Sequence, residues 1–261
     1  MEIIILPTPT EVGRVAASLI ASVVTAKPDA VLGLATGSSP LDIYHSLAER
    51  VASGELDFSH ASGFALDEYV GIPLAHPESY ASVIARDVTG PLGLDPARVR
   101  VPDGRATDLE AATTEYDAAI AAAGGVDIQI LGIGANGHIG FNEPTSSFAS
   151  RTRIKTLAPS TREANARFFD DPADVPTHCL TQGLGTILDA KRVVLVAQGR
   201  GKADAVSAMV EGPLSAMCPG SALQLHGHAT IVIDEEAASK LTLAEYYKYT
   251  YANKPEWQRF E

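Results

Sequence analysis

Short, largely apolar runs recur through this chain, and most are followed by a segment with helical spacing. The runs occupy residues 2–6, 30–34, 62–66, 127–131, 193–197 and 230–233. After the first run, Val12, Val15, Leu19 and Val23 repeat along one face of a helix. Strands that are buried on both faces and alternate with helices are typical of parallel sheets. The sequence therefore predicts a Rossmann-like, doubly wound α/β fold, with a mostly parallel sheet and helices on both faces.

The remaining segments fit the same architecture. We expect helices at residues 109–122, 161–169, 181–188 and 235–251, and an edge strand with alternating basic residues at residues 150–157. No Pro/Gly/Ser-rich linker, repeat or low-complexity stretch separates these elements. A chain of 261 residues, 46% of them hydrophobic, has enough apolar material for one large core. We therefore expect residues 1–261 to form a single domain.

Charge and cysteine content restrict the partners and the compartment. The formal net charge of −12 argues against nucleic acid and anionic membranes as partners, because both require a basic face. No apolar run approaches the ~20 residues of a membrane span, and the N-terminus lacks the basic segment of a signal peptide. Cys179 and Cys218 show no metal-like spacing. Two free thiols predict a reducing, cytoplasmic location.

A glycine-rich stretch, LGIGANGHIGFNEP, follows the apolar run at residues 127–131. It carries an amide, an imidazole and a carboxylate, at Asn136, His138 and Glu143. These three groups on one loop are suited to proton transfer, and catalytic residues concentrate on strand-end loops of α/β scaffolds. The alternative is a loop whose polar groups only hydrogen-bond to its own backbone. The density of polar and glycine residues favours catalysis.

Two further strand ends carry the features of an anion site. Residues 30–34 lead into Thr36, Gly37, Ser38 and Ser39, where hydroxyls and a helix start can bind an anion. The spacing does not match the GxxxxGK[ST] loop, so a nucleoside triphosphate is not indicated. Lys202 stands at another helix start, where a lysine is electrostatically disfavoured unless an anion binds there. An ordinary N-cap and an exposed lysine are the alternatives.

Asp67 and Glu68 end the run at residues 62–66, and side-chain alternation allows only one of them to face a given pocket. Arg167 lies on a helix that is interrupted by Pro172 and Pro176, as expected of a surface flap. In doubly wound folds, ligands bind at the carboxyl ends of the strands. The sequence therefore predicts proton transfer on a phosphorylated small molecule.

Two groups of side chains carry weaker signals. His226 and His228 are two residues apart, but no third metal ligand is evident, so core or surface histidines are favoured. Arg151, Arg153 and Lys155 indicate a solvated face. From the residues alone, we assign neither group a function.

These motifs resemble the glucosamine-6-phosphate deaminase family of the sugar-phosphate isomerase group. The segments that carry the resemblance are LATGSSP, LDEYVG with HPESY, GIGANGHIGFNEP, SRTRIKTL, TREANARFF and LQLH, in the family's order. The resemblance implies conversion of glucosamine 6-phosphate to fructose 6-phosphate and ammonia, in amino-sugar catabolism. It also implies that neither a metal nor an organic cofactor takes part. We class this activity as an aldose–ketose isomerase and deaminase, within the hydrolases.

The resemblance also implies a role for each site residue. Asp67 would move a proton between C2 and C1, and His138, with Glu143 and Asn136, would open the pyranose ring. The phosphate would be held by Thr36, Gly37, Ser38, Ser39, Arg167 and Lys202. Some members carry aspartate where this chain has Asn136. An amide can orient the imidazole of His138, but it cannot neutralise an imidazolium.

Some members of this family also bind N-acetylglucosamine 6-phosphate at an allosteric site between subunits. Ser146, Arg153 and Lys155 match the basic part of that site, whereas several C-terminal tyrosines compete for its last position. We therefore expect a homo-oligomer, specifically a hexamer, with this second site.

Two other functions remain open from the sequence. A 6-phosphogluconolactonase shares the fold and a similar His loop, but lactone hydrolysis needs no base at C2. A non-catalytic sugar-phosphate-sensing module would need the phosphate contacts without the set of Asp67, His138 and Glu143. Such a module would normally carry a DNA-binding segment, and none is evident.

Overall fold

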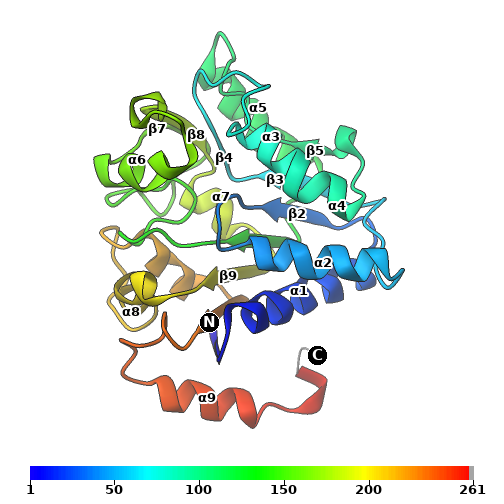
Figure 1. The fold of residues 1–261 in the computed structure, drawn as a ribbon, viewed down its shortest axis with the longest axis vertical. Coiled ribbons are helices and arrows are strands. Elements are labelled where there is room, and N and C mark those ends of the chain that lie inside the picture. The colour runs from blue at the N-terminus through cyan, green and yellow to red at the C-terminus, as the bar shows by residue number, and fades with distance from the viewer. Residues whose placement is uncertain (259–261) are drawn as a thin grey trace.

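The computed structural model describes residues 1–258 and confirms the α/β architecture (Figure 1). Within these residues, a seven-stranded parallel sheet has the order β1-β10-β9-β6-β2-β3-β5. Its strands are β1 (Glu2–Leu6), β2 (Val31–Leu34), β3 (Ser62–Ala65), β5 (Val99–Arg100), β6 (Ile128–Leu131), β9 (Val193–Ala197) and β10 (Ala229–Asp234). β2, β6 and β9 are buried along their whole length, because helices cover both faces of the sheet.

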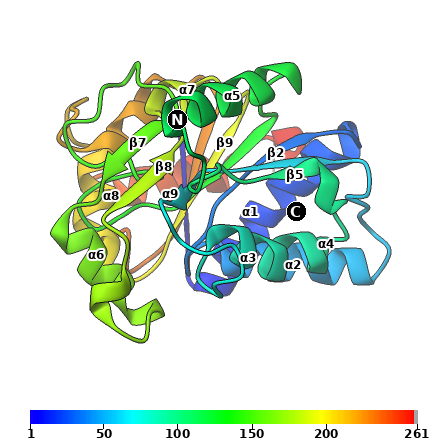
Figure 2. The ribbon, with the colours of Figure 1, turned by 90° about the horizontal axis from the view of Figure 1, so that it is seen from above.

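Figure 2 shows how the helices cover the sheet. α1 (Pro9–Ala26) and α2 (Leu41–Ala52) lie on one face, and α5 (Leu109–Ala122) and α7 (Leu184–Leu188) lie on the other. The other α-helices are α3 (Tyr80–Ile84), α4 (Gly90–Leu92), α6 (Pro159–Asn165), α8 (Ala203–Val210) and α9 (Ala244–Ala252), and a π-helix (Ala85–Thr89) joins α3 to α4. The main core lies between the sheet and the two helical layers.

The chain changes its direction across the sheet between β2 and β6. β2 is followed outward by β3 and β5, whereas β6 is followed in the opposite direction by β9 and β10. The loops after β2 and β6 therefore diverge at the carboxyl edge of the sheet. Such a switch point is where doubly wound folds bind their ligands.

A second sheet of three antiparallel strands has the order β4-β8-β7, with β4 (Asp67–Tyr69), β8 (His178–Thr181) and β7 (Arg153–Thr156). The edge strand expected within residues 150–157 is confirmed as β7. The helix expected at residues 181–188 is confirmed as α7, but it begins only at Leu184, since Thr181 ends β8. β8 forms because β4 and β7, both distant in sequence, pair with its two edges.

The C-terminal segment also differs from the prediction. A helix was expected from residue 235, but α9 begins only at Ala244. The carboxylate of Asp234 accepts hydrogen bonds from the amides of Gly199 and Ala237, which folds the chain into turns after β10.

His226 is buried and its Nε2 lies 2.7 Å from the carbonyl oxygen of Ala190, so it belongs to the core. Within residues 1–258, no helix has the length and apolarity needed to span a membrane.

Candidate active site

The glycine-rich loop after β6 packs tightly around one imidazole. A Cβ atom on Gly134 would lie 2.2 Å from Cε1 of His138, so the ring requires glycine at this position. Gly140 has a φ of 53°, and a Cβ there would lie 3.1 Å from Oγ1 of Thr181 and 3.6 Å from Oδ2 of Asp67. Glycine therefore lets the loop approach both His138 and the carboxylate of Asp67.

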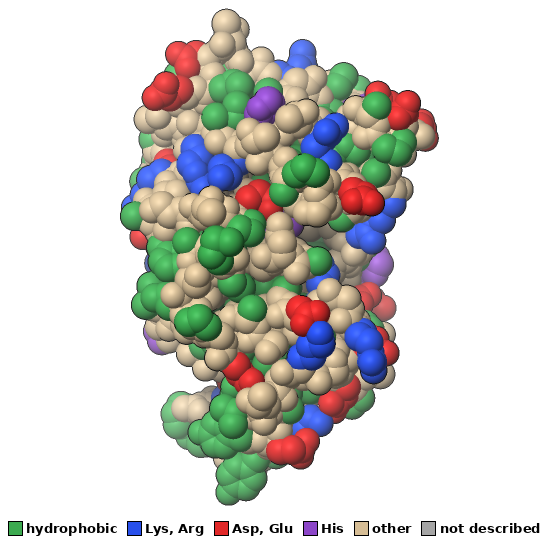
Figure 3. Space-filling view, turned by 90° about the vertical axis from the view of Figure 1, so that its left-hand side faces the viewer, with side chains coloured by type: hydrophobic (Ala, Val, Ile, Leu, Met, Phe, Trp, Pro, Cys, Tyr) green, Lys and Arg blue, Asp and Glu red, His purple; other side chains and the backbone are tan. Residues whose placement is uncertain are grey.

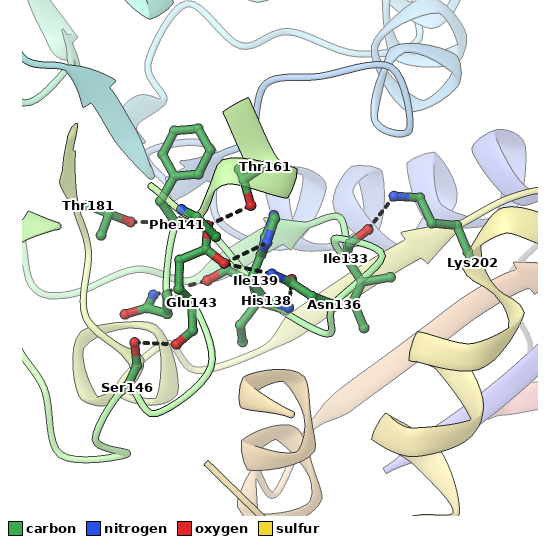
Figure 4. Close-up of polar contacts among 12 residues, drawn as sticks. Ile133, Asn136, His138, Ile139, Phe141, Glu143, Ser146, Thr161, Thr181 and Lys202 are labelled. Carbon is green, nitrogen blue, oxygen red and sulfur yellow. Dashed lines mark hydrogen bonds and ion pairs between the residues drawn. The ribbon is translucent and has the colours of Figure 1, made fainter. Parts of the chain in front are cut away.

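Glu143 links the side chains of this loop (Figure 4). Its Oε2 accepts a hydrogen bond of 2.7 Å from Nδ2 of Asn136 and lies 3.6 Å from Nδ1 of His138. Burial opposes ionisation, but the nearby imidazole of His138, with hydrogen bonds from Thr161 and Ala158, lowers the pKa of Glu143 to about 2. A fixed negative charge therefore faces one nitrogen of the imidazole, an arrangement suited to stabilising an imidazolium.

The adjacent acids Asp67 and Glu68 point in different directions, as strand alternation predicts. Glu68 accepts hydrogen bonds from the amides of Tyr69, Tyr80 and Ala81 and so holds the start of α3. Asp67, which is only 6% exposed, lines the cavity.

Asp67 has an unusual acidity for a carboxyl group. Burial, reinforced by the charge of Glu68, raises its pKa to about 8, although hydrogen bonds from Thr181 and the Phe141 amide oppose this shift. In its ionised form, a carboxylate with such a pKa is a stronger base than an ordinary carboxylate.

The loop after β2 lies at the other end of the site. Tyr44 Oη both donates to the carbonyl of Ala35 and accepts from its amide, which anchors the loop where it begins. Nη2 of Arg167 donates to Oγ of Ser38 at 3.4 Å, and Nζ of Lys202 donates to the carbonyl of Ile133 at 2.6 Å. Burial, and then the charge of Arg167, lower the pKa of Lys202. Two cations held near each other in this way favour an anion between them.

A single cavity of about 960 Å³ brings these groups together. Among the expected site residues, its lining includes Thr36, Gly37, Ser38, Ser39, Asp67, Asn136, His138, Arg167 and Lys202. Glu143 lies behind Asn136 and His138, and contacts both. On the side of the molecule in Figure 3, Lys and Arg side chains are interspersed with Asp and Glu side chains. Because the net charge of the chain is −12, the positive charge of Arg167 and Lys202 is a local feature of the cavity.

Several further residues of this site were not predicted from the sequence. Tyr69, Tyr80 and Asn165 line the cavity, and the hydroxyl of Tyr69 accepts hydrogen bonds from Tyr80 and Asn165. Thr161, on α6, donates a 2.6 Å hydrogen bond to Oε1 of Glu143. The two tyrosines stand within the motifs LDEYVG and HPESY, and Thr161 and Asn165 stand within TREANARFF, so these motifs offered a signal for all four residues. The contacts of Thr161 depend on tertiary structure.

The residues of the expected allosteric site lie beside the glycine-rich loop but outside the cavity lining. Ser146 is 2% exposed and its Oγ donates to the carbonyl of Glu143. Nη1 of Arg153 donates to Oδ1 of Asn142 at 2.9 Å. The solvated face expected for Arg153 and Lys155 is wrong: both are half-buried, and Ile154 between them is 48% exposed. The contact of Arg153 with Asn142, in the glycine-rich loop, lies on the covered face.

Comparison with known proteins identifies the family. The sequence model described as glucosamine-6-phosphate isomerases/6-phosphogluconolactonase matches residues 9–232. The chain belongs to this family. It is 61% identical, over 99% of both chains, to a protein of Pseudarthrobacter chlorophenolicus named glucosamine-6-phosphate deaminase. A protein of Streptomyces coelicolor with the same name is 58% identical, also over 99% of both chains.

Solved structures of the family agree with the fold. A structure described as a monomeric glucosamine-6-phosphate deaminase has a TM-score of 0.90 and 43% identity, and the match covers 92% of this chain and all of that one (100%). The 6-phosphogluconolactonase from Trypanosoma cruzi has a TM-score of 0.76 at 20% identity, over 92% of this chain and 97% of its own. The second likeness concerns the fold alone. The predicted family and fold class are thus confirmed.

Proposed function

We propose that this protein catalyses the isomerising deamination of glucosamine 6-phosphate to fructose 6-phosphate and ammonia. One observation carries the proposal: a buried carboxylate, Asp67, shares a cavity with the His138–Glu143 pair and a cationic anion site. The names of the relatives at 61% and 58% identity support the same substrate.

The phosphate fixes the substrate at one end of the cavity. Its oxygens accept hydrogen bonds from the loop at Thr36, Gly37, Ser38 and Ser39, and from Arg167 and Lys202, as the cluster of donors and cations favours. The sugar then extends from this anchor towards Asp67 and His138. Anchoring by a remote group supplies binding energy that orients the reacting carbons.

Ring opening is the task proposed for His138. The imidazole accepts the proton of the C1 hydroxyl and returns a proton to the ring oxygen, while the bond between C1 and that oxygen breaks. Imidazole serves as acid and base near neutral pH. Glu143 stabilises the imidazolium formed between the two transfers, and Asn136 holds Glu143 in place. The product is the open-chain aldehyde.

Isomerisation and loss of ammonia follow. Asp67 removes the proton from C2, the aldehyde oxygen gains a proton from the ammonium group on C2, and a C1–C2 enolamine forms. Asp67 then delivers its proton to C1, which leaves an imine at C2. Water adds to C2 and ammonia leaves, giving the ketone of fructose 6-phosphate. Consumption of this water is the reason for placing the net reaction among hydrolases, although its proton transfer is that of an isomerase.

The decisive experiment measures ammonia and fructose 6-phosphate released from glucosamine 6-phosphate by the purified protein. Asp67→Asn should abolish both products, because the amide has no proton-accepting oxygen of comparable basicity. Asp189→Asn, which changes an exposed carboxylate in an ion pair with Arg151, is the matched control. Release of ammonia by the Asp67→Asn variant at the normal rate would contradict the proposed role.

A 6-phosphogluconolactonase is the second candidate, because structures of that name share the fold. Lactone hydrolysis needs no proton transfer at C2, so Asp67→Asn would spare it. Hydrolysis of 6-phosphogluconolactone that is unchanged in this variant, without ammonia release by the native protein, would favour the lactonase. A non-catalytic sensor would bind the sugar phosphate and leave it unchanged.

Assembly and location are separate proposals. We infer a hexamer with an activator site from the match of Ser146, Arg153 and Lys155 to the family's allosteric residues. Nη2 of Arg153 is buried and has no hydrogen-bond partner among residues 1–258, which leaves a donor for an anion. The structure described as a monomeric deaminase favours a monomer instead. Sedimentation, together with kinetics in the presence of N-acetylglucosamine 6-phosphate, decides between them.

The free thiols of Cys179 and Cys218 support a cytoplasmic location.

A further inference from the structure

Glu143 connects two parts of the site that carry out different tasks. Its Oε2 faces the glycine-rich loop, where it contacts Asn136 and His138. Its Oε1 faces α6, where it accepts hydrogen bonds of 2.6 Å from Oγ1 of Thr161 and 3.1 Å from the amide of Ala158. The carboxylate therefore bridges the catalytic loop and the start of α6 (Figure 4).

The helix on the other side of this bridge leads to the anion site. α6 (Pro159–Asn165) continues directly into a 3-10 turn (Ala166–Phe168) that carries Arg167. Nη2 of Arg167 reaches Oγ of Ser38 in the loop after β2. A path of hydrogen bonds and helix therefore joins Ser38 to Glu143, through Arg167 and Thr161, and Glu143 lies 3.6 Å from Nδ1 of His138.

We propose that Thr161 is a positioning residue for ring opening, because it fixes Glu143 against His138 and links that pair to the helix that holds Arg167. This inference rests on the proposed deaminase function. Thr161 is 5% exposed, and its short hydrogen bond is made to a charged acceptor, the kind of bond that contributes most to orientation. Thr161 lines the cavity, where its hydroxyl donates to Glu143, and through that carboxylate it acts on His138.

The distance between Glu143 and His138 indicates how this link would affect the imidazole. The 3.6 Å from Oε2 to Nδ1 exceeds a hydrogen bond, and Nδ1 is buried without a hydrogen-bond partner among the described residues. A small displacement of the carboxylate towards the ring would complete the bond. Because Thr161 and Ala158 hold Oε1, a movement of α6 moves Glu143 as well. Occupation of the anion site by phosphate is thereby coupled to the orientation of the imidazole.

The test is a double-mutant cycle on ammonia release from glucosamine 6-phosphate. Thr161→Val keeps the shape of the side chain and removes the hydroxyl. In the otherwise native protein it should lower kcat about 10-fold to 100-fold, the range for one hydrogen bond to a charged group, with KM changed by less than about threefold. In the Glu143→Gln background the same substitution should lower kcat by less than about threefold, because the carboxylate through which Thr161 acts is already absent.

Control variants separate this role from a structural one. Thr152→Val removes an equally buried threonine hydroxyl that is bonded to Asp117, away from the cavity, and should leave kcat unchanged. Thr161→Ser should restore kcat to within about threefold of the native value, whereas Thr161→Ala should not. The Ser and Ala variants differ only in the hydroxyl, so they test the inference even if Thr161→Val fails to fold.

The outcomes distinguish the inference from the function on which it rests. Equal losses from Thr161→Val in the native and Glu143→Gln backgrounds would overturn the inference, since Thr161 would then act independently of Glu143. Equal kcat in the Ser and Ala variants would also overturn it. Failure of the native protein to release ammonia would instead overturn the proposed function.

Discussion

Nη2 of Arg167 lies 3.4 Å from Oγ of Ser38, although the two residues are 129 positions apart in the sequence. Ser38 belongs to the loop at the switch point of the sheet, and Arg167 to the segment that follows α6. The guanidinium carbon of Arg167 lies over the ring of Phe168, 4.7 Å from the ring centroid. Arg167 therefore joins the proposed anion site to the segment after α6 and stacks on its own neighbour.

Arg167→Gln should weaken substrate binding more than it slows the chemistry. The amide removes one of the two cations at the anion site, and a charge-assisted contact to phosphate is among the stronger hydrogen bonds. We expect KM for glucosamine 6-phosphate to rise about 10-fold or more, with a smaller fall in kcat. Arg151→Gln, which removes an exposed arginine paired with Asp189, should leave KM unchanged. A normal KM in Arg167→Gln would remove Arg167 from the phosphate site.

The pH profile should report on Asp67. A base must be ionised to accept the C2 proton, and burial raises the pKa of Asp67 to about 8 in the empty site. We therefore expect kcat/KM to rise with pH and to level off above this pKa, after correction for titration of the substrate itself. The hydrogen bond from Thr181 opposes the rise in the pKa of Asp67. Thr181→Val should therefore move the increase in kcat/KM to higher pH, and Thr181→Ser should not. A profile that is flat from pH 6 to pH 9 would contradict this assignment.

Asp67→Asn should stabilise the fold at high pH while it removes activity. The unfolded carboxyl loses its proton near ~pH 3.9, whereas the folded one keeps it until about pH 8. The folded state therefore binds the extra proton between these values, and native stability falls across this window relative to the Asn variant. Thermal unfolding should give the variant the higher Tm at pH 9 and a smaller difference at pH 5. Each kcal/mol of difference in the free energy of unfolding corresponds to roughly 2–4 °C in Tm. An equal Tm difference at both pH values would refute the linkage.

The large sheet could be predicted because its strands are buried on both faces and so read as apolar runs. β9, at Val193–Ala197, is one example. The small sheet could not, because the sequence of β8 carries no distinctive signal and the strand depends on pairing with β4 and β7. For β7, alternation showed that Arg153 and Lys155 share a face, but not that this face is the covered one.

The candidate site shows the same division between local and long-range information. Asn136, His138 and Glu143 stand close together on one loop, so their cluster was visible in the sequence. The contact between Glu143 and Thr161 joins residues 18 positions apart, on separate elements, and needed the structure. The side chain at position 136 is where this chain departs from the family pattern, and it allows a further test.

Asn136→Asp should shift the pH dependence of turnover more than it changes binding. Nδ2 of Asn136 donates to Oε2 of Glu143 at 2.7 Å, so aspartate would place a second carboxylate oxygen against the first. Two carboxylates at this distance cannot both ionise freely, and the added negative charge favours the imidazolium form of His138. The activity that depends on neutral imidazole should therefore begin at a higher pH in the variant.

Rate measurements across the pH range check this prediction, with KM measured at each pH. Asn136 supplies orientation without charge, so KM should change by less than about threefold, since the phosphate contacts lie elsewhere in the cavity. A profile that coincides with that of the native protein would show that the charge at position 136 does not reach the imidazole. In that case, Asn136 would serve only to hold Glu143.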